Sequence, residues 1–177
     1  MEIWNTITFR ANTRQKHLDK HERICRELKW LAKGENYIAP NVKHYIIMKG
    51  GATVVGYYSI AEHEHGRQAS ICAFYIAPTF RGQGLGKTAL LKILYGLYKM
   101  NKYATIFCRV AIDNQIALSL YKKYSWFLGK DGRLHNESDS AAIDPTTNEY
   151  TMVFMEKVWG DTSYTMKEAL KDVFNRE

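Results

Sequence analysis

The stretch that decides the fold reads RGQGLGKT and spans residues 81–88, immediately before an apolar pattern with helical spacing. Its three glycines allow positive φ and a close approach of the backbone to a ligand. The first turn of the following helix offers free N–H groups and a partial positive charge. Arg81 and Lys87 place a cation at each end. The stretch therefore predicts a binding site for phosphate or pyrophosphate.

Two common nucleotide-binding loops fail to match this stretch. The Walker A pattern G-x-x-x-x-G-K-[ST] fits residues 86–88, but its first glycine falls on Arg81. The dinucleotide pattern G-x-G-x-x-G begins with residues 82–84, but its last glycine falls on Lys87. Because each pattern fails at an essential position, neither nucleotide class is expected.

The elements around the stretch predict a strand–helix–strand crossover. A strand at Gln68–Ala77 ends at Pro78, and a helix at Leu85–Met100 follows the glycines. The apolar residues that share one side of this helix are Leu85, Ala89, Ile93, Leu94 and Leu97. A second strand at Tyr103–Ile112 completes the unit, which predicts a parallel pair of strands within the sheet.

The rest of the chain predicts more strands than helices. Val42–Lys49 and Ala52–Ala61 are rich in Val, Ile and Tyr and flank Gly50-Gly51, which indicates a hairpin. With the strand at 68–77 they predict an antiparallel meander. The other expected elements are a strand at 2–9, helices at 14–32 and 114–124, strands at about 126–134 and 149–158, and a terminal helix at 162–175. The order predicts an α/β or α+β fold with a mixed, mostly antiparallel, central sheet of about six to seven strands flanked by helices.

Composition limits the class of protein. The chain has 177 residues, 46 % apolar and 24 % charged, which predicts a single domain over residues 1–177. No stretch is long and apolar enough to cross a membrane, and the first ten residues lack the features of a signal peptide. We therefore expect a soluble, cytoplasmic protein with no membrane partner.

The cysteines and the net charge indicate which metals and binding partners to expect. Cys25, Cys72 and Cys108 are far apart and form no CxxC pair, so neither a disulfide framework nor a zinc site is indicated, and no metal is expected. The net charge of +7 favours an anionic partner. Coenzyme A, with its three phosphates, is one candidate and nucleic acid is another.

With this context the stretch resembles the acyl-coenzyme A loop of the GNAT (GCN5-related) N-acetyltransferase family. The family pattern [QR]-x-x-G-x-[GA] reads RGQGLG at residues 81–86, after a strand that ends in Ile76-Ala77-Pro78. The resemblance implies that coenzyme A contacts Arg81, Gly82, Gln83, Gly84, Leu85, Gly86, Lys87 and Thr88. It further implies that the pantetheine arm binds backbone groups of Phe74 and Ile76 like an added strand.

A second element, N-x-x-A-x-x-x-Y, resembles the family's next helix. It places Asn114, Ala117 and Tyr121 on one helical face, and Asn114 is a plausible N-cap. The resemblance implies that Asn114 contacts coenzyme A, that Ala117 leaves room for it, and that the Tyr121 hydroxyl protonates the departing thiolate. Tyr124 is the alternative donor. Ser125 replaces the glycine that many members have after this helix, and Trp126 their Phe or Tyr, which predicts a frayed or reshaped helix end.

The general base is not assigned by the sequence. Many members carry a Glu on the strand that corresponds to residues 69–77, but this strand contains no acidic residue. The cluster of Glu62, His63, Glu64 and His65 is a candidate for a base or for metal ligands, although a solvated hairpin end is the favoured interpretation. His135 and Glu137 are further candidates, and an amine that is already neutral needs no base.

The sequence therefore predicts an acetyl-CoA-dependent N-acetyltransferase that transfers an acetyl group to a primary amine of a small molecule or a protein. Two alternatives stay open: a catalytically silent acyl-CoA-binding module, and a toxin-like acetyltransferase that acts on aminoacyl-tRNA. The basic helix at 14–33 and the net charge motivate the second alternative. The expected partners are acetyl-CoA and an amine acceptor, and the expected state is a monomer or a homodimer.

Overall fold

The computed structural model describes residues 5–28, 37–157 and 164–165. These residues fall into two compact units, one drawn from Met1–Glu62 and Ile71–Leu90 and the other from His63–Ser70 and Leu91–Glu177. The expectation of a single domain stays a prediction.

The strands, in chain order, are β1 (Ile7–Ala11), β2 (Val42–Lys49), β3 (Thr53–His63), β4 (Gln68–Ile76), β5 (Thr105–Ala111), β6 (Trp126–Leu128), β7 (Leu134–His135), β8 (Ile143–Asp144), β9 (Glu149–Lys157) and β10 (Tyr164–Thr165). The helices are α2 (Gln15–Glu27), α3 (Leu85–Lys99) and α4 (Gln115–Tyr121), with short 3-10 turns η1 (Glu64–Gly66), η2 (Pro78–Phe80) and η3 (Ser138–Ser140). Both units mix helices with strands.

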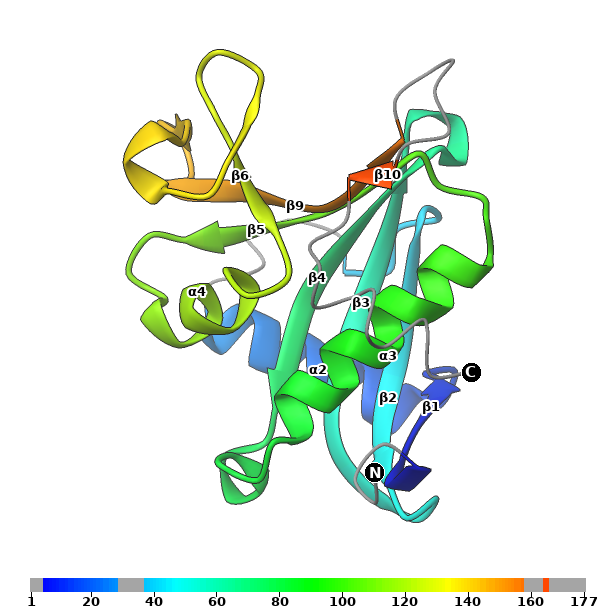
Figure 1. The fold of residues 1–177 in the computed structure, drawn as a ribbon. Helices are drawn as coiled ribbons and strands as arrows, with labels where there is room; N and C mark the ends of the chain where they lie inside the picture. The colour runs from blue at the N-terminus through cyan, green and yellow to red at the C-terminus, as the bar shows by residue number, and fades with distance from the viewer. Residues whose placement is uncertain (1–4, 29–36, 158–163, 166–177) are drawn as a thin grey trace. The chain divides into compact units, whose positions relative to one another are not determined.

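In the first unit, the strands follow the order β1-β2-β3-β4, and Figure 1 shows α2 behind them. β2 pairs antiparallel with β1 and with β3. Gly50 and Gly51 close the β2–β3 hairpin at φ +61° and +74°, so the predicted hairpin is confirmed. The core of this unit holds Ile24, Ile46 and Met48, together with Tyr57.

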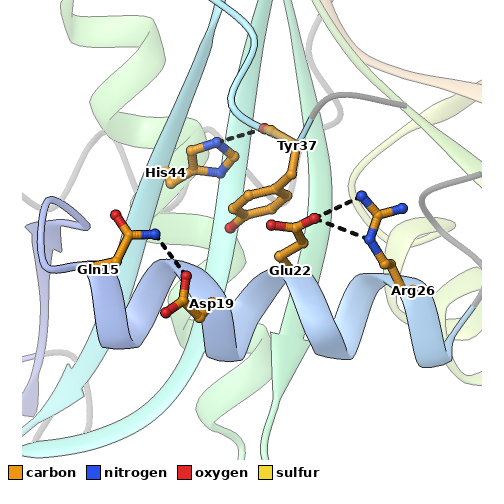
Figure 2. Close-up of polar contacts among 6 residues, drawn as sticks. All are labelled: Gln15, Asp19, Glu22, Arg26, Tyr37 and His44. Carbon is orange, nitrogen blue, oxygen red and sulfur yellow. Dashed lines mark hydrogen bonds and ion pairs between the residues drawn. The ribbon is translucent and has the colours of Figure 1, made fainter. Parts of the chain in front are cut away.

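Helix α2 is amphipathic. Ile24 and Cys25 are buried toward the sheet, as the helical pattern requires. On the outer face, shown in Figure 2, the Gln15 amide donates to Asp19 at 2.7 Å, and Arg26 pairs with Glu22 at 2.6 Å. Both contacts join residues four apart, the spacing at which helical side chains meet.

The second unit is organised on β9, which pairs antiparallel with β5 and β6, while β7 pairs with β6. The first three residues of β4 lie parallel to β5, with Gln68 opposite Thr105. This confirms the predicted crossover. The largest fully buried side chains here are Phe127, Phe154, Ile106 and Met152.

The fold class is confirmed, although the number of strands and two element boundaries differ from the sequence prediction. The chain contains ten described strands instead of six or seven, because short two-residue strands escape pattern analysis. The strand expected at 2–9 begins at Ile7. Helix α2 ends at Glu27, and residues 29–32 of the helix expected at 14–32 lie outside the described residues.

Two further predictions about the late part of the chain were wrong in part. The strand expected at 126–134 is a hairpin, because Gly132 takes φ +75° and Asp131 accepts a hydrogen bond from the Arg133 N–H within the turn. Tyr164–Thr165 were expected to lie in a terminal helix at 162–175, but they form the strand β10 and pair with β9. The rest of that segment lies outside the described residues.

None of the helices in the described part of the chain is long and apolar enough to cross a membrane.

Candidate active site

The RGQGLGKT stretch forms an exposed turn between β4 and α3, entirely within the first unit. Gly82 and Gly84 both take φ +74°, a region that disfavours residues with a Cβ. Leu85 is the first residue of α3, and its buried side chain anchors the turn. A Cβ built at Gly82 meets no atom within 4 Å, so the glycine is required for its backbone angle and leaves open space above the turn.

Helix α3 directs its first N–H groups toward this turn. The first hydrogen bond along the helix runs from the Thr88 N–H to the Gly84 carbonyl at 3.1 Å. The N–H groups of Leu85, Gly86 and Lys87 therefore have no partner within the helix. With the exposed Lys87 ammonium beside them, they suit an anion such as the pyrophosphate of coenzyme A.

Arg81 fastens the turn to the end of β4. Its Nε–H donates to the Ile76 carbonyl at 3.0 Å, and its guanidinium carbon lies 5.7 Å from the centre of the Tyr75 ring. The side chain is otherwise exposed, so its remaining N–H donors face solvent. Gln83 is held as well, because its amide donates to Thr79 and accepts from Lys49.

Strand β4 is irregular where acyl-CoA contacts were predicted. Ala73, immediately before Phe74, takes φ +50°, a conformation that costs a residue with a side chain about 1–2 kcal/mol. Phe74 and Ile76 are half-buried. An alternating pattern of side chains does not reveal such a kink, because Ala is compatible with an ordinary strand.

Helix α4, in the second unit, carries the other predicted residues. The Asn114 side chain caps the helix by accepting a hydrogen bond from the Ala117 N–H at 3.2 Å, which confirms the predicted N-cap. Ala117 is half-buried. The sequence prediction of this helix is correct in place, but the helix ends at Tyr121 and not at Tyr124.

Tyr121 is buried at the end of α4. Its ring meets Phe154 edge-on, with centroids 5.7 Å apart. Burial, and then the neighbouring Cys108, raise the pKa of the Tyr121 hydroxyl above its ordinary value. The hydroxyl therefore keeps its proton at neutral pH.

Ser125 provides the helix end that glycine usually provides. Its hydroxyl and its backbone N–H both donate to the Tyr121 carbonyl, at 2.8 and 2.9 Å. These bonds satisfy a carbonyl that the helix end leaves open. Ser125 is not among the residues that take positive φ, so no glycine is needed at its position. Of the two expectations, a frayed or a reshaped helix end, the structure shows a reshaped end that Ser125 caps, and the buried Tyr124 lies directly before this cap.

The candidate bases do not form a shared cluster. Glu62 pairs with Lys43 at 3.0 Å, His63 bonds the Ser70 hydroxyl at 2.9 Å, and His135 bonds Asp131 at 2.9 Å. Within residues 5–28, 37–157 and 164–165, no three His, Cys, Asp or Glu side chains are grouped to hold a metal ion.

Comparison with known proteins identifies the family. The profile of the Acetyltransferase (GNAT) family matches residues 4–126, which is more than half of the chain. The chain belongs to the GNAT family. The matched residues of this GNAT chain include the loop at 81–86 and helix α4.

Solved structures share this GNAT fold at low sequence identity. A putative acyl-CoA N-acyltransferase from Klebsiella pneumoniae is 18 % identical, with 84 % of this chain and 97 % of that chain covered and a TM-score of 0.59. The spermidine/spermine N-acetyltransferase SpeG from Vibrio cholerae is 13 % identical, with coverage of 96 % and 99 % and a TM-score of 0.63.

A third similar structure is the Salmonella typhimurium acetyl transferase that modifies the N-terminal serine of ribosomal protein L7/L12. It is 16 % identical, with coverage of 85 % and 95 % and a TM-score of 0.57. No curated protein matches the chain. At these identities the solved structures show the fold alone.

A network of histidines in this GNAT chain was missed by the sequence analysis. His21 on α2 is fully buried, and its ring nitrogens contact the Tyr37 hydroxyl at 2.6 Å and the Ala73 carbonyl at 3.0 Å. His44 joins the same group through its Nε2, which lies 3.0 Å from the Tyr37 carbonyl. The only available signal was that His21 falls on the apolar face of the helix at 14–32, beside Leu18 and Cys25.

Burial of His21 makes the protein sensitive to acid. Desolvation lowers the pKa of His21 from 6.5 to about 4, against the opposing effect of the Ala73 carbonyl, and His44 lowers it further. The unfolded chain binds the proton that the folded chain rejects, so stability falls as the pH drops from about 6.5 to about 4. The titration of His21 alone should lower the free energy of unfolding by about 3 kcal/mol at pH 4 relative to pH 7.

Urea denaturation of the wild type and of His21→Gln at both pH values measures this effect. The loss of unfolding free energy between pH 7 and pH 4 should be smaller in His21→Gln, which has no imidazole at this position. His17 and His44, whose pKa values burial also lowers, remain in both proteins and cancel in the comparison. An equal loss in both proteins would show that His21 does not cause it.

Proposed function

We propose that the protein is an acetyl-CoA-dependent N-acetyltransferase that acetylates a primary amine of a small molecule or a protein. The observation that carries the proposal is the exposed glycine turn at the N-terminus of α3, within a chain of the GNAT family. Acetyl-CoA supplies the acetyl group as a reactive thioester.

The residues of the turn bind the donor. The N–H groups of residues 85–87 and the Lys87 ammonium bind phosphate, and the Arg81 guanidinium adds charge while it keeps the turn on the end of β4. Gly82 and Gly84 allow this backbone, and Thr88 closes the first turn through a hydroxyl bond to Gly84. Phe74 and Ile76 supply backbone groups to the pantetheine arm.

The residues of α4 complete the transfer. Asn114 holds the start of the helix, and Ala117 leaves space on the face that it shares with Tyr121. The Tyr121 hydroxyl donates its proton to the departing thiolate, which leaves more easily when a positioned donor stabilises its developing charge. The neutral acceptor amine attacks the thioester carbonyl and the C–S bond breaks; the surplus proton on nitrogen passes to solvent, from which the Tyr121 phenolate regains the proton that it gave to the thiolate.

The nature of the acceptor draws support from similar structures. SpeG is a spermidine/spermine N-acetyltransferase, and the Salmonella protein modifies an N-terminal serine. Both acceptors are amines, one of a small molecule and one of a protein. An RimL structure in the same group is described in complex with coenzyme A.

Calorimetry and a thiol-release assay test the proposal. Titration with acetyl-CoA should show one saturable site, and free thiol should appear when a panel of polyamines and peptide N-termini is added. Binding without thiol release from any acceptor would favour a silent acyl-CoA-binding module. Failure to bind acetyl-CoA would overturn the proposal.

Arg81→Ala should weaken coenzyme A binding about tenfold. The variant loses the bond to the Ile76 carbonyl and one cation near the phosphates, together worth about 1.4 kcal/mol. Arg81→Lys is the matched control, because it keeps the charge but cannot reproduce the Nε–H bond. Calorimetry at low and high salt separates the two contributions, and wild-type affinity in both variants would exclude Arg81 from the site.

A further inference from the structure

One ring nitrogen of a buried histidine contacts β4, the strand that is proposed to bind acyl-CoA. His21 on α2 has no exposed surface, and its Nε2 lies 3.0 Å from the Ala73 carbonyl of β4, 52 residues further along the chain. Its Nδ1 lies 2.6 Å from the Tyr37 hydroxyl. Both nitrogens therefore have a partner inside the first unit.

The partners determine where the protons lie. A carbonyl oxygen only accepts, so His21 Nε2 must carry a hydrogen and donate it to Ala73. In the neutral ring, Nδ1 is then an acceptor, and the Tyr37 hydroxyl donates to it. The ring is thus a neutral Nε2–H tautomer in which every polar atom is satisfied.

Neighbouring groups hold the His21 ring in this orientation. The Tyr57 ring stacks on it, with centroids 5.0 Å apart and planes 19° apart. His44 fixes Tyr37 from the other side: its Nε2 donates to the Tyr37 carbonyl at 3.0 Å, as Figure 2 shows, and its Nδ1 accepts from the Ser59 hydroxyl at 2.7 Å. Each hydrogen bond of this network therefore has one fixed donor and one fixed acceptor.

The bond to Ala73 changes the direction of a peptide group. Hydrogen bonds between strands lie within the sheet, whereas α2 packs against its face. A carbonyl that accepts from α2 is therefore turned out of the sheet, consistent with φ +50° at Ala73. Because the peptide is trans, the Phe74 N–H points away from the Ala73 carbonyl, toward the face opposite α2.

We propose that His21, as the Nε2–H tautomer, is a positioning residue that holds the Ala73–Phe74 peptide turned out of the sheet and thereby directs the Phe74 N–H to acyl-CoA. The proposal rests on the proposed function, which places acyl-CoA along β4. It explains why a histidine is buried among tyrosines on a helix that carries no other predicted site residue.

Two amide variants separate the two contacts of His21. His21→Gln places an N–H donor at the position of Nε2 and keeps the contact with Ala73. His21→Asn reaches only the position of Nδ1, so it keeps an acceptor for Tyr37 and loses Ala73. His44→Gln is the control, because the glutamine amide keeps an N–H donor for the Tyr37 carbonyl, while the hydrogen bonds of His44 go to Tyr37 and Ser59 and not to Ala73.

Coenzyme A affinity measured by calorimetry is the readout, with thermal melting as the test of folding. His21→Asn should bind coenzyme A at least tenfold more weakly than the wild type, while His21→Gln and His44→Gln should stay within threefold. In turnover, the KM for acetyl-CoA should rise in His21→Asn more than kcat falls. Equal affinity of the Gln and Asn variants at position 21 would overturn the inference.

A measurement on the wild type does not depend on any variant. Long-range ¹H–¹⁵N spectra of the imidazoles should show His21 protonated at Nε2 and not at Nδ1, and the opposite tautomer would overturn the inference. If the wild type fails to bind coenzyme A, the proposed function fails as well, whereas wild-type binding with equal variants removes only the role of His21.

Discussion

Tyr121→Phe should lower kcat about a hundredfold while coenzyme A affinity stays within threefold of the wild type. Proton transfer by a positioned side chain commonly contributes a factor of about 10² to 10⁴. The hydroxyl is buried at the end of α4, where desolvation and Cys108 raise its pKa and keep it protonated. The Phe ring preserves the edge-on contact with Phe154, so the fold should be retained.

Tyr124→Phe is the matched control for this prediction. Tyr124 is also buried and lies three residues further along, beyond the helix end that Ser125 caps. Single-turnover thiol release, measured at saturating acetyl-CoA, separates the chemical step from binding. A large loss in Tyr124→Phe with little change in Tyr121→Phe would transfer the donor role to Tyr124, and no loss in either variant would remove both from the mechanism.

Gly56→Ala should destabilise the protein by about 3 kcal/mol or more, because it overpacks two backbones. A Cβ built at Gly56 on β3 lies 2.1 Å from the Tyr75 carbonyl oxygen and 3.1 Å from Ile76 Cδ1. A backbone carbonyl cannot rotate aside as a side chain does. The two strands must separate, which also endangers the 2.9 Å bond from the Ala77 N–H to the Val55 carbonyl.

Gly96→Ala is the matched control, since it adds the same methyl group to an exposed helix position. A Cβ at Gly96 meets nothing within 4 Å, so alanine should stabilise α3 by up to about 1 kcal/mol. Urea denaturation of both variants measures the difference. Coenzyme A binding should also weaken in Gly56→Ala, because Tyr75 and Ile76 lead directly into the turn. Wild-type stability of Gly56→Ala would show that β3 and β4 can separate without cost.

Local interactions explain which parts of the fold the sequence predicts well. β2 matches its predicted bounds of Val42–Lys49, because Gly50-Gly51 fixes the hairpin within a few residues. α3 departs from its prediction by a single residue, because its apolar side repeats over four turns. The Asn114 cap needs only the residue three positions later. The two-residue strands β7, β8 and β10 have no comparable local signal.

The sequence by itself determined the family, the glycine turn and the residues of α4, because each depends on neighbours within one turn or one helix. The tertiary structure decided three features that no local pattern contains. They are the bond from His21 to the Ala73 carbonyl, the contact of Gly56 with Tyr75, and the burial of Tyr121 against Phe154. Each joins residues that are distant along the chain, and a carbonyl or a hydroxyl gains its partner only when packing brings those segments together.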